Sequence, residues 1–160
     1  MGVAGSGKSS LAALIASRLM LPFIEGDDFH SEQSKAKMHA GIALDDNDRA
    51  QWLDLLGREL AGHRGGAILA CSTLKKSYRD RLRAAVLQLG FVFLDIDRAA
   101  ASERVRARAP QHLFPPSLVD SQFATLEPPV AEPGVLWLKA TDSLEVLAGQ
   151  ALAWIGAQGG

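Results

Sequence analysis

Residues 2–9 read GVAGSGKS, and this stretch decides how the rest of the 160-residue sequence is interpreted. It fits the pattern G-x-x-x-x-G-K-[ST] at every fixed position. Gly5 and Gly7 permit backbone dihedral angles that other residues avoid, so the loop can curl and direct successive N–H groups at one polyphosphate. A helix that begins near Ser9 would point its positive end at the same anion. The stretch therefore predicts a phosphate-binding loop, against the alternative of an ordinary glycine-rich turn.

Two side chains of this loop carry chemistry. Lys8 supplies a mobile cation for the transferred phosphate, and the hydroxyl of Ser9 is a ligand for Mg²⁺. Only Met1 precedes the loop, whereas a phosphate loop of this kind follows a β-strand. We therefore expect a chain that starts too late for a complete sheet. Its structure should show four main parallel strands, with a gap or a displaced segment beside the loop.

The composition is that of one soluble globular domain spanning residues 1–160, with 48% hydrophobic and 22% charged residues. A net charge of −1 gives no electrostatic basis for binding nucleic acid or an anionic membrane. Cys71 is the only cysteine, which excludes a disulfide framework and fits a cytoplasmic location. It lies in an apolar run, so we expect a core residue rather than a nucleophile. No apolar run is long enough to span a bilayer.

Short apolar runs alternate with amphipathic helical patterns along the whole chain. The runs predict strands at 22–24, 67–71, 91–94 and 135–138. The patterns predict helices at 10–19, 34–39, 46–60, 78–89, 98–109, 118–126 and 144–155. This alternation predicts a parallel α/β sheet with right-handed crossovers.

Polar clusters follow the predicted strands, where ligands bind in open α/β sheets. Asp27 and His30 follow the first strand, and Lys75 and Lys76 follow the second. A solvated loop with an aspartate cap is the alternative for Asp27 and His30. Arg49 falls in the first turn of a helix, where the helix dipole disfavours a cation. It therefore needs a partner, either a carboxylate of residues 45–48 or an anionic ligand.

The arrangement of charge indicates phosphoryl transfer to a small molecule. Arg104 and Arg108 share one helix face before a proline-punctuated segment, so a lid around 105–122 is expected. In this interpretation Lys8 and a lid arginine stabilise the moving phosphoryl group, and Asp27 orients the attacking hydroxyl and accepts its proton. A GTPase is disfavoured because the sequence contains no N-K-x-D motif.

Six runs of residues, in order over nearly the whole chain, resemble those of the bacterial thermoresistant gluconokinase family. They are Met1–Ser9, Gly26–Asp27 with His30, Lys37–Met38 with Gly41, Leu44–Arg49 with Trp52–Leu53, Cys71–Lys76 with Tyr78–Asp80, and Ser121–Glu127. Many kinases share the phosphate loop. The patterns C-S-x-L-K-K-x-Y-R-D and L-x-D-x-D-R-x-x-W-L are much more specific.

The resemblance implies a P-loop NTPase fold of the nucleoside monophosphate and shikimate kinase type. This is a three-layer αβα sandwich with a parallel sheet of order 2-3-1-4-5, of which strand 1 is largely missing from this chain. The implied reaction is the phosphorylation of D-gluconate on its 6-hydroxyl by ATP with Mg²⁺, giving 6-phospho-D-gluconate and ADP. The family is typically dimeric, so a homodimer is expected.

The resemblance also assigns residues to roles. Asp27 would face the attacking hydroxyl, and His30, Arg49 and Lys75 are candidates for binding gluconate, whose carboxylate needs a cation. Mg²⁺ would be bound through Ser9. ATP would be bound by Gly2, Val3, Ala4, Gly5, Ser6, Gly7, Lys8, Ser9 and Ser10, with Arg104 and Arg108 on the lid side.

The sequence departs from the family pattern at three places. Ser31 stands where the family has proline, Ser34 stands where asparagine is usual, and the lid signature reads QHLFP at 111–115. Two other functions remain open at this point. One is another small-metabolite kinase of the same fold, such as a shikimate or nucleotide kinase. The other is a catalytically impaired nucleotide-binding protein, because of the short segment before the loop.

Overall fold

The computed structural model describes residues 1–108 and 117–158, apart from the side chains of Arg108 and Ser117. Its elements are, in chain order, α1 (Lys8–Leu19), β1 (Phe23–Glu25), the 3₁₀ helix η1 (Gly26–Phe29), α2 (Glu32–His39), α3 (Asp46–Gly62), β2 (Ile68–Ala70), α4 (Lys76–Ala85), β3 (Phe91–Asp95), α5 (Arg98–Arg108), α6 (Ser117–Thr125), β4 (Val135–Lys139) and α7 (Leu144–Gln158). In the described part of the chain, no helix combines the length and the apolarity needed to cross a bilayer.

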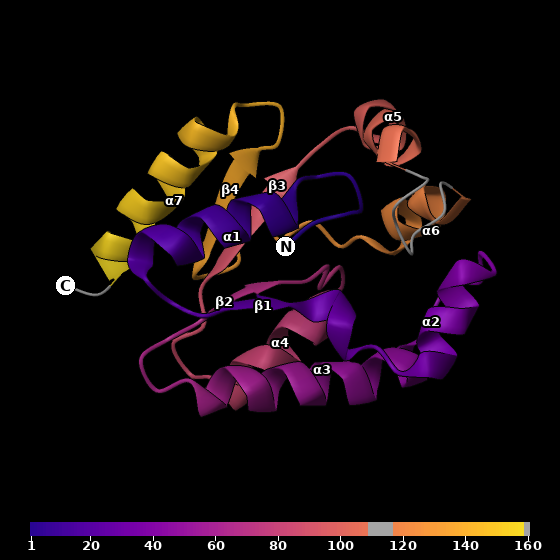
Figure 1. Cartoon of the computed structure of the whole chain (residues 1–160), viewed down its shortest axis with the longest axis horizontal. Coiled ribbons are helices and arrows are strands. Elements are labelled where there is room, and N and C mark those ends of the chain that lie inside the picture. The colour runs from indigo at the N-terminus through magenta and orange to yellow at the C-terminus, as the bar shows by residue number, and fades with distance from the viewer. Residues whose placement is uncertain (109–116, 159–160) are drawn as a thin grey trace.

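The four strands form two parallel pairs, β1 with β2 and β3 with β4 (Figure 1). These pairs are the neighbours expected on the two sides of a 2-3-1-4-5 sheet, so the prediction of four parallel strands is confirmed. Met1 and Gly2 lie between the pairs. The N–H of Leu94 in β3 donates to the Met1 carbonyl at 3.0 Å, and the N–H of Gly2 donates to the Ser72 carbonyl beyond β2 at 3.2 Å. The stretch before the phosphate loop thus bridges the two pairs through its backbone.

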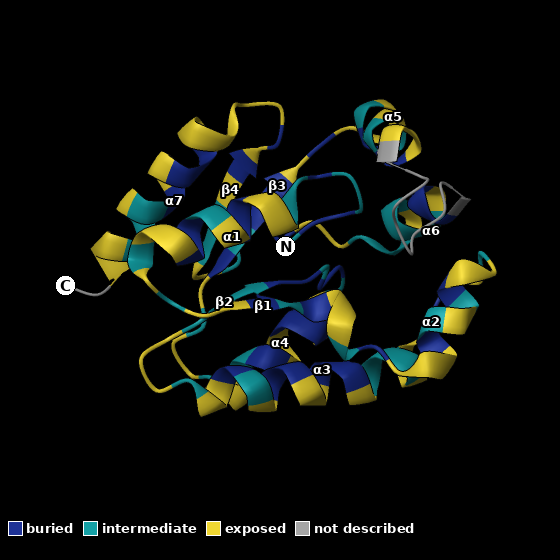
Figure 2. Ribbon diagram, in the orientation of Figure 1, coloured by how far each residue is buried: buried dark blue, intermediate teal, exposed yellow. Residues whose placement is uncertain are grey.

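Helices cover the strands from two sides, which gives the expected three layers (Figure 1). On one side α1 packs against α7, β1 and β2, and on the other α3 packs against α4. Each side has its own apolar cluster. The first includes Leu11, Ile15, Leu94, Leu138 and Leu147, and the second includes Trp52, Leu53, Leu56, Tyr78 and Leu82. The exposed residues of α3 lie along the side of the helix that faces away from the strands (Figure 2).

Local sequence signals account for where two site-bearing helices begin. Asp45 caps α3, since its carboxylate accepts from the N–H of Asp48 at 2.9 Å. The Asp48 carboxylate accepts from the N–H of Asp45 at 3.1 Å, which completes a capping box. Gly7 precedes α1 with φ of 94°, a left-handed conformation that favours glycine. These caps set the positions of Lys8 and Arg49.

The predicted helix over 78–89 is wrong at its C-terminal end. α4 ends at Ala85, and Val86 is extended with φ of −136°. Leu87 is exposed, whereas Leu89 still packs against the second apolar cluster. The chain must turn here to enter β3 at Phe91, so burial of Leu89 does not require helix. The apolar spacing typical of a helix therefore extends to Leu89, although the helix ends at Ala85.

Candidate functional site

The phosphate loop has the backbone that its glycines predict. Gly5 and Gly7 have φ of 80° and 94°. A β-carbon on Gly5 would lie 2.7 Å from the carbonyl oxygen of Ala101, so only glycine fits there. The half-buried Lys8 donates from Nζ to the Val3 carbonyl at 2.9 Å. Burial lowers the pKa of Lys8, and the negative charge of Asp27 opposes that shift.

Four side chains with oxygen atoms gather on the cavity side of this loop. Ser9, Glu25, Asp27 and Asp28 all line the same cavity. Burial raises the pKa of Glu25, and a hydrogen bond with Ser9 opposes the rise. Among the described residues, no group of three His, Cys, Asp or Glu side chains is placed to hold a metal by itself. This donor set fits Mg²⁺, which keeps waters and substrate phosphates and needs only one or two protein oxygens.

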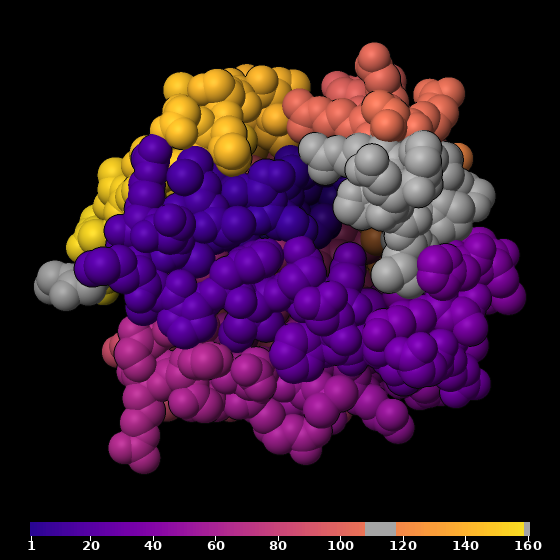
Figure 3. All heavy atoms as spheres, in the orientation of Figure 1, coloured from indigo at the N-terminus to yellow at the C-terminus, as the bar shows by residue number. Residues whose placement is uncertain are grey.

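A cavity of about 460 Å³ opens beside the loop. Its described lining consists of Ala4, Gly5, Gly7, Lys8, Ser9, Ser10, Glu25, Asp27, Asp28, His30, Met38, Ala43, Leu44, Arg49, Trp52, Ser72, Val105, Leu118, Ser121 and Gln122. The surface in Figure 3 is hollowed where the indigo N-terminal segment meets the purple segment that follows β1. The cavity brings together Lys8, Ser9, Asp27, His30 and Arg49 from the predicted site.

His30 is held by an aromatic partner at the floor of this cavity. Its ring stacks on Trp52 with centroids 4.5 Å apart and planes at 12°. Trp52 is fixed in turn, because its Nε1 donates to the Gly26 carbonyl at 2.7 Å. Nε2 of His30 lies 3.9 Å from Oδ1 of Asp27, and the buried Nδ1 has no hydrogen-bond partner among the described residues. Burial, aided by Arg49, lowers the pKa of His30, while Asp27 opposes that shift. The ring is therefore neutral at neutral pH.

This lowered pKa predicts how stability depends on pH. The unfolded chain binds a proton at His30 near pH 6.5, whereas the folded protein binds it only at lower pH. The stability contributed by neutral His30 is therefore present above that pH and is lost as the pH falls below it. We expect His30→Gln to flatten the decline of the melting temperature between about pH 7.5 and 5. Thermal unfolding of both proteins across this range tests it, and parallel curves would contradict it.

Arg49 and Lys75 share one cavity, but only Arg49 also lines the cavity beside the phosphate loop. Arg49 lines the main cavity, donates to the Leu44 carbonyl and lies 5.8 Å from the ring centroid of Tyr78. Among the ion pairs of the described residues, none joins Arg49 to a carboxylate of its own helix turn. Lys75 donates to Asp46 at 2.6 Å and lines a second cavity of about 410 Å³. Arg49 borders both cavities, whereas Lys75 is not part of the described lining of the first.

Of the two arginines predicted on the lid side, the structure describes the side chain of Arg104. Arg104 donates to the Gly5 carbonyl at 3.4 Å and to the Ala140 carbonyl at 3.0 Å. Its guanidinium is thus bound to the backbone of the phosphate loop, and it is absent from the described cavity lining. The side chain of Arg108 and residues 109–116 of the predicted lid lie outside the described residues.

Several cavity residues were not predicted as site residues. Glu25 is the last residue of β1 and Ser72 follows β2, so the rule of ligand binding beyond strand ends could have found both. Gln122 accepts from the N–H of Ala4 at 2.6 Å and so ties α6 to the phosphate loop. Trp52 lies on the buried face of α3, within the second apolar cluster. Its contact with His30 has no signal in the local pattern.

Comparison with known proteins shows which family the chain resembles. Residues 1–129 match the family described as AAA domain. A gluconokinase of Gluconobacter oxydans is 44% identical over 134 residues, covering 81% of this chain and 74% of that protein. The thermoresistant gluconokinase of Escherichia coli is 38% identical over 135 residues, covering 82% and 77%.

The fold also agrees with that of a solved gluconokinase structure. The crystal structure of a gluconokinase from Sinorhizobium meliloti 1021 superposes with a TM-score of 0.89 at 40% identity, covering 98% of this chain and 89% of that one. The resemblance drawn from the motifs is thereby confirmed, as is the P-loop kinase fold. The chain belongs to the gluconokinase family.

Proposed function

We propose that this protein transfers the γ-phosphoryl group of ATP to the 6-hydroxyl of D-gluconate, giving 6-phospho-D-gluconate and ADP. One observation carries the proposal: a single cavity joins the phosphate loop to Asp27, His30 and Arg49. Family membership supports the sugar acid as the acceptor. We further propose that the nucleotide is used as its Mg²⁺ complex, and that the enzyme is a cytoplasmic homodimer.

The proposed chemistry assigns one task to each group. The loop N–H groups and Lys8 hold the phosphates, and Ser9 provides an oxygen ligand for Mg²⁺, which neutralises phosphate charge when bound. The substrate hydroxyl attacks the γ-phosphorus while the bond to the β–γ bridging oxygen breaks. Asp27 orients that hydroxyl and accepts its proton. The exposed carboxylate of Asp27 at the cavity edge suits this task, because it is free to meet a ligand.

Recognition of the acid falls to Arg49 in this proposal. Its guanidinium matches a carboxylate geometrically, and no carboxylate of the protein already occupies it in the described ion pairs. We expect Arg49→Ala to raise KM for gluconate about 10–100-fold, the loss of one charged hydrogen-bonding partner. Lys75→Ala should have a much smaller effect, because Lys75 is paired with Asp46. Steady-state kinetics at saturating ATP measures both, and equal rises would contradict the assignment.

A substrate panel tests the reaction itself. Purified protein is supplied with ATP and Mg²⁺ and with gluconate, shikimate, a nucleoside monophosphate or buffer, and ADP release is followed. Of these acceptors, we expect only gluconate to raise the rate of ADP release well above the rate in buffer. Turnover of shikimate or a nucleotide at or above the gluconate rate would replace the proposal with another kinase of this fold.

A further inference from the structure

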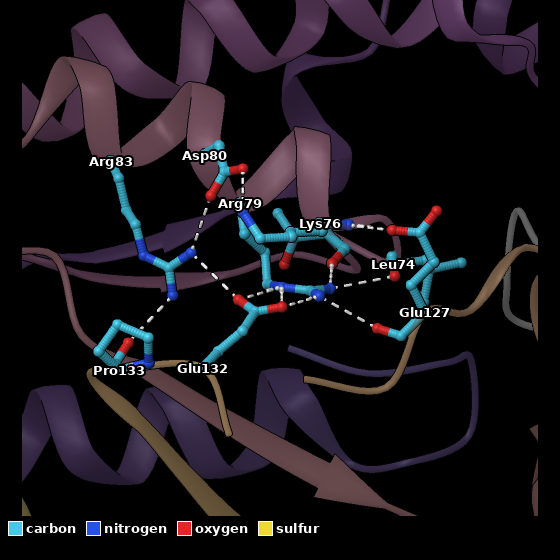
Figure 4. Close-up of polar contacts among 9 residues, drawn as sticks. Leu74, Lys76, Arg79, Asp80, Arg83, Glu127, Glu132 and Pro133 are labelled. Atoms are coloured by element: carbon cyan, nitrogen blue, oxygen red, sulfur yellow. Dashed lines mark hydrogen bonds and ion pairs between the residues drawn. The ribbon is translucent and has the colours of Figure 1, made fainter. Parts of the chain in front are cut away.

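Arg79 is a charged residue that the fold buries almost completely, with 1% of its surface exposed. It lies in α4, behind the cavity and outside its described lining. Figure 4 shows its guanidinium at the centre of a polar network. The network contains an ion pair with Glu132 and three bonds to backbone carbonyls. A buried arginine with this many partners costs desolvation and needs an explanation.

Two of the three carbonyl bonds of Arg79 meet in one short turn. Its Nη1 donates to the carbonyls of Thr73 and Leu74, both at 3.1 Å. Thr73 is buried and has φ of 40°, a left-handed conformation that β-branched residues avoid. Such a conformation persists only where neighbouring groups hold it. The two bonds from Arg79 are such a restraint.

This turn is joined to the cavity at two points. The Ser72 side of the turn lines the cavity, and the Ser72 carbonyl accepts from the N–H of Gly2 in the phosphate loop. The Leu74 carbonyl accepts from the N–H of Glu127 at 2.9 Å, just beyond α6. Nη2 of Arg79 also donates to the Glu127 carbonyl at 3.1 Å. The helix α6 carries Gln122, the residue that accepts from the phosphate loop.

We propose that Arg79 is a positioning residue for phosphoryl transfer. It holds the Ser72–Leu74 turn in its left-handed shape and fixes the end of α6 to that turn. In this way it fixes the position of the phosphate loop relative to the Ser72–Leu74 turn and to α6, which both contribute to the cavity lining. The proposal rests on the proposed function for its kinetic readout. It does not make Arg79 a catalytic residue, since Arg79 does not touch the cavity.

The chain provides a matched control in Arg83, one turn further along α4. Arg83 donates to the same Glu132 at 3.1 Å, and also to Asp80 and to the Pro133 carbonyl. It makes no described bond to the Ser72–Leu74 turn or to Glu127. Arg83 is more exposed than Arg79, at 24% against 1%, but both hold the same glutamate, so Arg83 tests whether loss of that ion pair alone affects the rate per folded molecule. A positioning role concerns Arg79 alone.

The test compares Arg79→Lys, Arg83→Gln and the double variant Arg79→Lys/Thr73→Gly. Lysine keeps a charge beside Glu132, but its ammonium cannot reproduce the planar fork that reaches three carbonyls. We expect Arg79→Lys to lower kcat/KM for gluconate at least about 10-fold per folded molecule, since small misplacements in a site have large kinetic effects. Arg83→Gln should stay within about 3-fold of wild type. Glycine at 73 adopts the left-handed conformation without strain, so the double variant should regain at least about 3-fold.

Folding is checked by circular dichroism and thermal unfolding, and all rates are measured well below the melting temperature. Equal losses in the Arg79 and Arg83 variants, no loss in Arg79→Lys, or no recovery with Thr73→Gly would overturn the proposal. So would an Arg79→Lys chain that fails to fold with either residue at 73, because Arg79 would then serve stability alone.

A second readout separates this proposal from the proposed function. Because Ser72 bonds to Gly2, calorimetric binding of ATP should follow the same ranking of variants. If the wild-type protein does not phosphorylate gluconate, the proposed function fails, and the ranking in ATP affinity still decides the role of Arg79.

Discussion

Replacing Lys8 with alanine is expected to lower turnover at least ~100-fold, since the variant loses a major charge contact with the transition state. Nζ of Lys8 is bonded to the Val3 carbonyl within the loop, so the side chain is already folded over the phosphate-binding backbone. Without a ligand, burial lowers the pKa of Lys8, although the nearby Asp27, Cys71 and Glu25 oppose this shift. A bound polyphosphate adds negative charge and favours the charged form. The lysine is therefore most strongly a cation when substrate is present.

The measurement is kcat at saturating ATP and gluconate, with Lys76→Ala as the matched control. Lys76 is an exposed lysine that pairs with Asp80 at 2.5 Å, far less buried than Lys8. Its replacement should leave kcat near the wild-type value, as expected for a surface ion pair. A Lys8→Ala rate near that of wild type would refute the role of Lys8, whatever the control does.

Asp27→Asn is expected to lower kcat about 10²–10⁴-fold, the usual contribution of a positioned general base. Asparagine keeps the shape of the side chain but cannot accept the proton of the attacking hydroxyl. Asp27 lies on η1 at the cavity edge, 3.9 Å from Nε2 of His30, and is well exposed. Its replacement should leave the folded structure intact, so the loss should fall on kcat rather than on stability.

Asp28→Asn is the comparison for this variant. Asp28 lines the same cavity one residue further along η1, so both variants remove one negative charge from the same place. Single-turnover rates and ATP affinity are measured for both. A deficit confined to Asp27 identifies the base, whereas equal deficits would show that the charge of the cavity matters and not the position of one carboxylate.

Much of the fold could be predicted because burial imposes a period on the sequence. Apolar runs correctly placed all four strands, and the helix predicted at 46–60 begins at the same residue as α3. The end of α4 could not be predicted, because the partly buried Leu89 packs on the core from a turn as readily as it would from a helix. Apolar spacing reports burial, and it reports helix only while the backbone stays regular.

The site, too, has parts that local sequence patterns predict and parts that they do not. The phosphate loop was predictable because its left-handed backbone positions require glycine, and the sequence shows glycine at those positions. The surroundings of Lys75 and Arg104 were not, because their partners come from distant parts of the chain. Lys75 meets Asp46, and Arg104 meets the Ala140 carbonyl. Their assigned roles stay predictions, and the geometry favours Arg49 over Lys75 as the residue that meets the acid.

The stacking of Trp52 on His30 also places an intrinsic fluorophore at the cavity. The chain has three tryptophans, and only Trp52 lines the cavity in the described structure. Trp137 is exposed on β4, and Trp154 in α7 lies beside Gly90. The indole of Trp52 absorbs and emits beside a titratable ring, in a place that a sugar acid would fill. Its emission should therefore register ligand occupancy without a coupled assay or an added dye.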